Sequence, residues 1–220
     1  LARLRQAHIC VIGIGGVGSW VVEALARSGI GELTLIDMDD ICVTNINRQL
    51  PAMSGTIGKL KTEVMSERVK LINPECTVNI IDDFISPENQ SDYLNRGYDY
   101  VIDAIDNVKT KASLIAYCKR NKINVITIGG AGGQTDPTQI QIADLSKTIQ
   151  DPLLAKVRSV LRKDYNFSQN PKRKFSIDAI FSTQPLIFPQ MTEDCSISAT
   201  MNCANGFGAA TMITATFGFF

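Results

Sequence analysis

The stretch His8-Ile-Cys-Val-Ile-Gly-Ile-Gly-Gly-Val-Gly18 decides the fold of this chain. Its first half is a short apolar run, which is typical of a buried strand. Its second half fits the pattern G-x-G-x-x-G, in which glycines let the backbone turn sharply and approach a phosphate group. A helix that begins at such a turn presents free N–H groups to that phosphate. The pattern therefore predicts a nucleotide site. Its four glycines are Gly13, Gly15, Gly16 and Gly18.

Apolar residues after the glycine turn recur at helical spacing over 19–28, and a second strand is expected over 32–36. Strand, helix and strand in this order form a βαβ unit, which implies a parallel sheet. The alternation continues, with helices expected over 59–72, 109–121 and 153–161, strands over 77–81, 100–103 and 124–128, and a loop over 169–174. We expect an α/β fold: a Rossmann-like, mostly parallel sheet with helices on both faces and a C-terminal extension of the sheet.

The composition is that of an ordinary globular protein, with 45% hydrophobic and 20% charged residues in a chain of 220. We expect a single domain over residues 1–220, with a nucleotide-binding core over 1–145 and an extension for substrate and dimer contacts over 146–220. Lys+Arg and Asp+Glu are equal at 22 each, so bulk charge does not indicate a nucleic-acid partner. Such a contact requires a local basic segment.

None of the cysteines forms a Cys-x-x-Cys pair, which excludes the common zinc-finger and dithiol redox patterns. Scattered cysteines of this kind indicate a reducing compartment, and we expect a cytoplasmic location. The six are Cys10, Cys42, Cys76, Cys118, Cys195 and Cys203.

The tail over 206–220 contains about 15 apolar or small residues, fewer than the roughly 18–20 needed to span a bilayer. We expect it to form a buried core helix or strand, with peripheral membrane contact as the alternative.

A second group of residues indicates which nucleotide binds. Asp37 ends the second strand, 19 residues after Gly18, where an acid can accept hydrogen bonds from ribose hydroxyls. This feature alone also fits an NAD-binding protein. Arg48 and Lys61 follow, however, and two cations suit a triphosphate better than a hydride-transfer site. Asp106, expected at the carboxyl end of a parallel strand, is a candidate ligand for Mg²⁺.

Each of these residues taken alone has a simpler interpretation. Lys61 also fits a solvated charge on a helix, Arg48 a surface ion pair, and Asp106 the N-cap of a helix. Their joint order after a glycine loop favours the nucleotide interpretation.

The order of these motifs resembles the ubiquitin-activating-enzyme-like superfamily of adenylating enzymes over residues 8 to about 145. The motifs are Asp37-Met-Asp-Asp40, Asn45-Ile-Asn-Arg-Gln49, Gly58-Lys-Leu-Lys61 and Asp103-Ala-Ile-Asp-Asn107. The resemblance implies ATP and Mg²⁺ as cofactors. It implies ribose binding by Asp37, phosphate binding by Asn45, Arg48 and Lys61, and Mg²⁺ binding by Asp106. Asp39 and Asn107 complete the expected nucleotide-binding set, and Arg48, Lys61 and Asp106 are the expected catalytic residues.

Further segments resemble one branch of this superfamily, the tRNA threonylcarbamoyladenosine dehydratases. They are Asp136-Pro-Thr-Gln-Ile140, Lys147-Thr-Ile-Gln-Asp-Pro152, Phe181-Ser-Thr183 and Cys203-Ala-Asn-Gly-Phe-Gly-Ala-Ala-Thr211. The resemblance implies ATP-dependent cyclising dehydration of a modified adenosine beside the tRNA anticodon, through adenylation of its carboxylate. It also implies tRNA as a partner, a homodimer, and a cysteine-desulfurase sulfur-transfer system.

The segment over 156–174 is consistent with an RNA partner, because it holds seven basic residues and one acid. A solvated basic helix and loop is the alternative for this segment. The basic residues are Lys156, Arg158, Arg162, Lys163, Lys172, Arg173 and Lys174.

Two other functions remain open. An adenylating enzyme for a sulfur-carrier or ubiquitin-like protein usually holds zinc with two Cys-x-x-Cys pairs, which this chain lacks. An NAD-binding Rossmann protein would have no use for Arg48 and Lys61. Cys195 and Cys203 are candidate covalent acceptors, although a small buried thiol is the favoured interpretation of Cys203. The segment Asp194–Met201 is short for the branch, so we expect a missing loop there.

Overall fold

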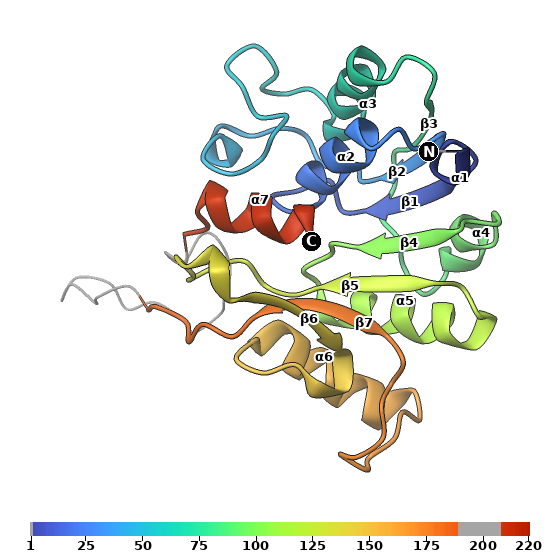
Figure 1. Cartoon of the computed structure of the whole chain (residues 1–220), viewed down its shortest axis with the longest axis vertical. Coiled ribbons are helices and arrows are strands. Elements are labelled where there is room, and N and C mark those ends of the chain that lie inside the picture. The colour runs from blue at the N-terminus through green and yellow to red at the C-terminus, as the bar shows by residue number, and fades with distance from the viewer. Residues whose placement is uncertain (1, 189–207) are drawn as a thin grey trace.

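A seven-stranded sheet organises the molecule in the computed structural model, which describes residues 2–188 and 208–220 (Figure 1). The strand order is β3-β2-β1-β4-β5-β7-β6, and every neighbouring pair is parallel except β6 and β7. The strands are β1 (His8–Ile12), β2 (Glu32–Ile36), β3 (Thr77–Ile81), β4 (Tyr100–Asp103), β5 (Val125–Ile128), β6 (Ile140–Asp144) and β7 (Asp178–Ser182). The expected α/β fold, with a C-terminal extension of the sheet, is confirmed.

Helices cover both faces of this sheet (Figure 1). They are α1 (Ala2–Arg5), α2 (Gly18–Arg27), α3 (Lys61–Ile72), α4 (Gln90–Leu94), α5 (Val108–Asn121), α6 (Pro152–Asp164) and α7 (Thr211–Phe219). Three short 3₁₀ helices lie in the connections: η1 (Val43–Asn45), η2 (Pro137–Gln139) and η3 (Leu145–Lys147).

Alternate side chains of the central strands enter two separate cores, because successive side chains of a strand point to opposite faces. Cys10 and Ile12 of β1 pack with buried residues of α5 and α6. Ile9 and Val11 pack on the other face with buried residues of α2, α3 and α7. Since the described helices cover both faces, a ligand of this sheet is expected at its edges or at the loops of the strand ends.

Most expected strands and helices were located to within a residue or two, and the small differences at two helix starts have local causes. α3 begins at Lys61 rather than at 59, because a bridge between Asp40 and Leu60 keeps the preceding residues extended. α6 begins at Pro152, since the Asp151 carboxylate caps it by accepting a hydrogen bond from the Leu154 N–H at 2.9 Å. β6 and β7 have only five residues each and are separated by α6, and the sequence pattern did not locate them individually.

The C-terminal tail forms α7, which packs beside α2 (Figure 1). Ile213 and Phe217 of this helix are fully buried in the core that α2 and α3 share. Among the described residues, no helix combines the length and the apolar character needed to cross a bilayer. The expected helix is present over 211–219, but it is buried on one face only, because Met212 and Phe219 are more than half exposed.

Several expectations fall outside the described residues. They concern Cys195 and Cys203 as covalent acceptors, the short segment Asp194–Met201, and most of the motif that begins at Cys203.

Candidate active site

The glycine loop joins β1 to α2 at the carboxyl edge of the parallel strands. Gly13 has φ +88°, and a Cβ there would lie 3.0 Å from the Ala104 carbonyl oxygen. A Cβ at Gly18 would lie 1.8 Å from the Gly13 carbonyl oxygen, so the turn closes on itself at this residue. Around Gly15 and Gly16 there is more space, with the nearest atoms 3.9 Å and 3.4 Å from a built Cβ. Gly13 and Gly18 therefore shape the loop, and the most open position of its backbone is Gly15.

Asp37, the residue after β2, is fixed against this loop. Its Oδ2 accepts a hydrogen bond from the Ile14 N–H at 2.6 Å, and its Oδ1 accepts one from the Asp39 N–H at 2.8 Å. Burial raises the pKa of Asp37, although these N–H groups and the nearby Lys61 oppose the shift. The two bonds leave further lone pairs on the carboxylate, which can accept from ribose hydroxyls.

Lys61, at the start of α3, reaches the same edge of the sheet and pairs with Asp39. The distance from its Nζ to Asp39 Oδ2 is 2.7 Å, and the Lys61 side chain is only 6% exposed. Burial excludes the interpretation of Lys61 as a solvated helix charge. A buried ammonium with a single carboxylate partner keeps two N–H donors for an anionic ligand.

Asn45 and Arg48 lie in the segment between β2 and α3. Asn45 is buried, and its Oδ1 accepts a hydrogen bond from the Cys42 N–H at 3.0 Å, which closes the turn at η1. The Arg48 guanidinium donates from Nη1 to the Thr44 carbonyl at 2.8 Å and to Asn47 Oδ1 at 2.9 Å. The aliphatic part of the Arg48 side chain lies against the glycine loop, because a Cβ built at Gly16 is 3.5 Å from both Cγ and Cδ of Arg48.

The C-terminal helix supports the Arg48 segment, a role that the sequence analysis did not identify. Thr214 Oγ1 of α7 donates to the Arg48 carbonyl at 3.4 Å, and Trp20 Nε1 of the neighbouring helix α2 donates to the same carbonyl at 3.1 Å. Thr211 Oγ1 donates to the Asn47 carbonyl. The built Cβ of Gly16 lies 3.4 Å from Thr214 Cγ2. α7 therefore lies directly over the glycine loop and fixes the residues that face it.

Asp106 and Asn107 occupy the turn between β4 and α5. Asn107 Oδ1 accepts from the backbone N–H groups of Lys109 and Thr110, both at 3.1 Å, so Asn107 is the N-cap of α5. The alternative interpretation of Asp106 as the N-cap is therefore wrong. Asp106 is exposed, one residue before the cap. The turn that carries it lies against the glycine loop, because a Cβ built at Gly13 would be 3.3 Å from the Ile105 nitrogen.

This arrangement fits Mg²⁺ in its chemistry. Among the described residues there is no group of three or more His, Cys, Asp or Glu side chains that could hold a metal alone. Mg²⁺ is usually bound by one or two carboxylates together with substrate phosphates and waters. An exposed Asp106 beside a phosphate loop suits that mode of binding, with the phosphates supplying further oxygens.

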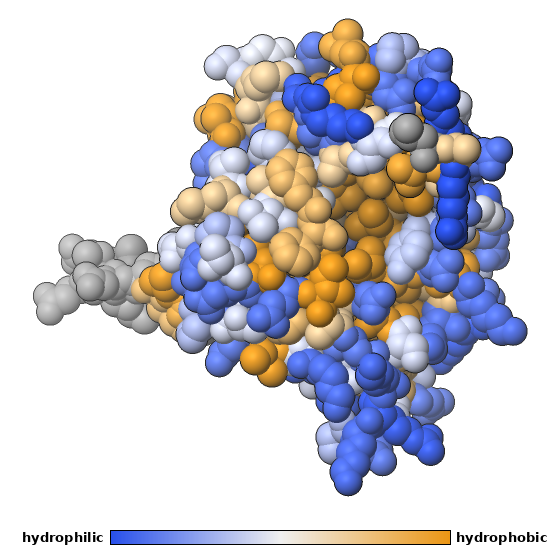
Figure 2. Space-filling model, in the orientation of Figure 1, coloured by the Kyte–Doolittle hydropathy of each residue, from blue (hydrophilic) through white to orange (hydrophobic). Residues whose placement is uncertain are grey.

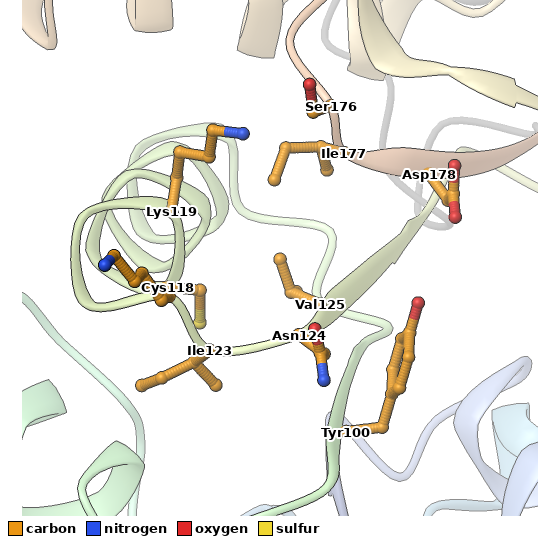
Figure 3. A pocket seen from close by; sticks show the side chains of 10 residues that line it. Tyr100, Cys118, Lys119, Ile123, Asn124, Val125, Ser176, Ile177 and Asp178 are labelled. Carbon is orange, nitrogen blue, oxygen red and sulfur yellow. The ribbon is translucent and has the colours of Figure 1, made fainter.

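A pocket of about 400 Å³ lies elsewhere, at the opposite edge of the sheet (Figure 3). Its lining includes Tyr100, Val125 and Asp178, which are the first residues of β4, β5 and β7. It is separated from the glycine loop by the length of these strands, so it is distinct from the predicted nucleotide site.

Comparison with known proteins assigns the chain to a family. The family model described as the ThiF family matches residues 1–216. The chain belongs to the ThiF family. This ThiF-family protein is 99% identical over 220 residues to a tRNA threonylcarbamoyladenosine dehydratase of Haemophilus influenzae, covering 100% of the chain and 84% of that relative. It is 60% identical over 226 residues to the enzyme of the same name from Escherichia coli, again covering 100% of the chain and 84% of the relative.

A solved structure agrees with this assignment. The crystal structure of E. coli tRNA N6-threonylcarbamoyladenosine dehydratase in complex with ATP matches the ThiF-family chain with a TM-score of 0.90 and 57% sequence identity. The match covers 99% of this chain and 83% of that one. The resemblance drawn from the motifs is thereby confirmed, as is the expectation of an adenylating enzyme of the dehydratase branch.

A buried pair of charges near this candidate site was not predicted from the sequence. Lys111 and Asp103 are both fully buried and lie 3.0 Å apart, measured from Nζ to Oδ2. A signal for it was present: Lys111 precedes Leu114, Ile115 and Cys118 at spacings of three, four and seven, which places it on the apolar face of α5.

Proposed function

We propose that the protein binds ATP with Mg²⁺ at the glycine loop and activates the carboxylate of threonylcarbamoyladenosine in tRNA by joining it to AMP. The observation that supports this most is the convergence of the glycine loop, the Asp37 carboxylate and the buried cation Lys61 at one edge of the sheet. ATP is present in the solved relative of the same fold.

The first step needs no general base, because a carboxylate is already an anion at pH 7. One of its oxygens attacks the α-phosphorus, and the bond from that phosphorus to the bridging oxygen breaks to release pyrophosphate. Arg48 and Lys61 hold the phosphates and offset the negative charge that develops on them. Mg²⁺, bound through Asp106, would supply further positive charge.

Ring closure follows on the activated acyl group. The carbamoyl group of the same side chain attacks the acyl carbon, the bond from that carbon to the AMP oxygen breaks, and the carbamoyl proton passes to solvent. The carboxylate oxygen leaves on AMP, so the nucleoside loses one water overall.

The basic segment over 156–174 is the surface that we propose for tRNA backbone contact. Figure 2 shows hydrophilic residues gathered at the lower end of the molecule, over α6 and the loop that follows it. Two of the seven basic residues are engaged internally: Arg158 donates to Thr148, and Arg162 lies 5.3 Å above the Phe175 ring. The exposed ones are Lys156, Lys163, Lys172, Arg173 and Lys174.

The two parts of the chain have separate roles in this proposal. Residues 1–145 form the nucleotide-binding core, and residues 146–220 form the extension that contacts substrate and a second copy of the chain. The homodimer and the exchange with a cysteine-desulfurase system rest on the family resemblance. Light scattering on the purified protein tests the dimer directly.

The function is tested with ATP labelled at the α-phosphate. Labelled AMP is expected when the protein is given Mg²⁺ and tRNA bearing threonylcarbamoyladenosine, and not when the same tRNA lacks the modification. AMP formation with a carrier protein that has a free C-terminal carboxylate, and none with the modified tRNA, would support the sulfur-carrier alternative instead.

A further inference from the structure

Lys111 is a lysine whose side chain is fully buried in the core, although it lies only three residues into α5. Its Nζ donates to the Ile105 carbonyl at 2.9 Å and to the Asp103 carbonyl at 3.2 Å, and lies 3.0 Å from Asp103 Oδ2. An ammonium group has three N–H donors, so these acceptors use all of them. Two of the three acceptors are backbone carbonyls of the turn between β4 and α5.

Asp103 is the other half of this arrangement. It is the last residue of β4 and is also fully buried. Its Oδ2 accepts from Thr127 Oγ1 of the neighbouring strand β5 at 2.7 Å, and its Oδ1 accepts from the Ile105 N–H at 3.1 Å. The N–H and the carbonyl of Ile105 are therefore both held by buried charged groups.

Asp106 follows this fixed residue directly. On its other side Asn107 is fixed as the N-cap of α5. The exposed carboxylate of Asp106 is thus the free group on a turn that is held on both sides. The backbone before it is held by Lys111 and Asp103, neither of which reaches the surface.

A purely structural role for the pair would be to anchor α5 to the sheet. Buried ion pairs are inefficient anchors, because apolar side chains of similar size often replace them without loss of stability. An apolar side chain at position 111 could pack in the same volume, but it could not donate to the Asp103 and Ile105 carbonyls. The feature that requires an ammonium is therefore the hold on the turn.

We propose that Lys111 is a positioning residue for Mg²⁺-nucleotide binding, which acts by fixing the turn that presents Asp106. The proposal rests on the function proposed above. It makes Lys111 necessary for the contribution of Mg²⁺ to nucleotide affinity, and unnecessary for binding of the nucleotide without the metal.

The test measures the affinity of a non-hydrolysable ATP analogue, with and without Mg²⁺, by titration calorimetry. The informative variant is the double change Asp103→Asn and Lys111→Met, which removes both charges and leaves no unpaired ion in the core. Lys119→Met, on the exposed end of the same helix, is the matched control. Thermal melting shows that each variant is folded. Thr127→Val, which removes only the hydroxyl that contacts Asp103, is a milder second variant.

In the wild-type protein and in Lys119→Met, Mg²⁺ is expected to tighten binding of the analogue by at least tenfold. In the folded double variant this enhancement is expected to fall below threefold, while affinity without Mg²⁺ stays within threefold of wild type. Thr127→Val is expected to give an intermediate enhancement.

A full Mg²⁺ enhancement in the double variant would overturn the proposed role of Lys111 and leave the proposed function standing. If the double variant does not fold, a full enhancement in Thr127→Val has the same meaning. If the wild-type protein does not bind the analogue at all, the proposed function fails together with this inference.

Discussion

Lys61 Nζ lies 2.7 Å from Asp39 Oδ2, and the two partners are buried very unequally: the lysine side chain is 6% exposed and the aspartate 53%. The lysine has already lost most of its solvation in the folded chain, while the aspartate can return to water. A phosphate group that arrives at Lys61 therefore competes only with a well-solvated carboxylate.

Replacement of Lys61 by Met is expected to lower kcat/KM for AMP formation by about 10- to 100-fold. A hydrogen bond to a charged group contributes about 1.5–3 kcal/mol, and each 1.4 kcal/mol is tenfold. Lys59→Met, two residues earlier and exposed, is the control and is expected to behave as wild type. Steady-state kinetics with the labelled ATP makes the comparison, and equal loss in the two variants would contradict the assignment of Lys61.

Asp106→Ala is expected to abolish AMP formation and leave the fold intact. The side chain is exposed and the N-cap of α5 is Asn107, so no cap is lost. Circular dichroism and thermal melting check the fold, and AMP release checks the activity. AMP release close to the wild-type rate would exclude Asp106 from the site.

Two glycine variants of the loop separate an effect on protein stability from an effect on ATP affinity. Gly18→Ala places a Cβ 1.8 Å from the Gly13 carbonyl oxygen, a backbone clash, and is expected to destabilise the protein by about 3 kcal/mol. Gly15→Ala meets nothing closer than 3.9 Å and is expected to keep its melting temperature within a few degrees. Its ATP affinity is nevertheless expected to fall at least tenfold, because the added methyl group occupies space left for phosphate. Unchanged ATP affinity in Gly15→Ala would place the phosphates elsewhere.

The raised pKa of Asp37 predicts that the affinity for adenosine depends on pH. Burial raises the pKa of this carboxyl group, so it becomes protonated at a higher pH than an ordinary aspartate does. The carboxylate is the form that accepts from ribose hydroxyls at both oxygens, and adenosine affinity is expected to fall as the pH falls through the raised pKa. Adenosine is the suitable probe because it has no phosphate that titrates in this range. Asp37→Asn is expected to bind adenosine weakly and without this pH dependence; a dependence that persists in the variant would assign the titration to another group.

The raised pKa of Asp37 has the opposite effect on the stability of the fold, which decreases as the pH rises. The folded state holds the Asp37 proton more tightly than the unfolded state does. The contribution of Asp37 to stability is therefore fully present below the ordinary pKa of aspartate and is lost as the pH rises through the raised pKa. At neutral pH the buried carboxylate costs stability, which is consistent with a residue kept for binding.

The sequence predicted the nucleotide half of this fold well, for a physical reason. Residues 8–37 contain a strand, a glycine turn and a helix in direct succession. Residues that contact one another in this part of the fold are therefore also close in the sequence. The strands β6 and β7 are different, because the pattern of neither shows that Ile140 pairs with Ser182 across an intervening helix. The contact of α7 with the Arg48 segment likewise joins residues more than 160 positions apart, such as Thr214 and Arg48.

The site residues divide in the same way. Asp37 and Lys61 were predicted from their places after a strand and at the start of a helix, and the structure brings both to the same edge of the sheet. Asn107 was expected to bind nucleotide, but its Oδ1 caps α5, a role that depends on where the helix begins. Lys111 was missed because nothing in the order of motifs distinguishes a buried lysine from a solvated one. Only its position on the apolar face of α5 does so.

The most direct measurement uses the purified protein with ATP, Mg²⁺ and tRNA that bears threonylcarbamoyladenosine, followed by digestion and nucleoside mass spectrometry. We expect the modified nucleoside to lose the mass of one water, only when ATP is present, and not with Asp106→Ala. An unchanged nucleoside in the presence of an active, ATP-binding protein would contradict the dehydratase function and direct attention to carrier proteins with a free C-terminal carboxylate.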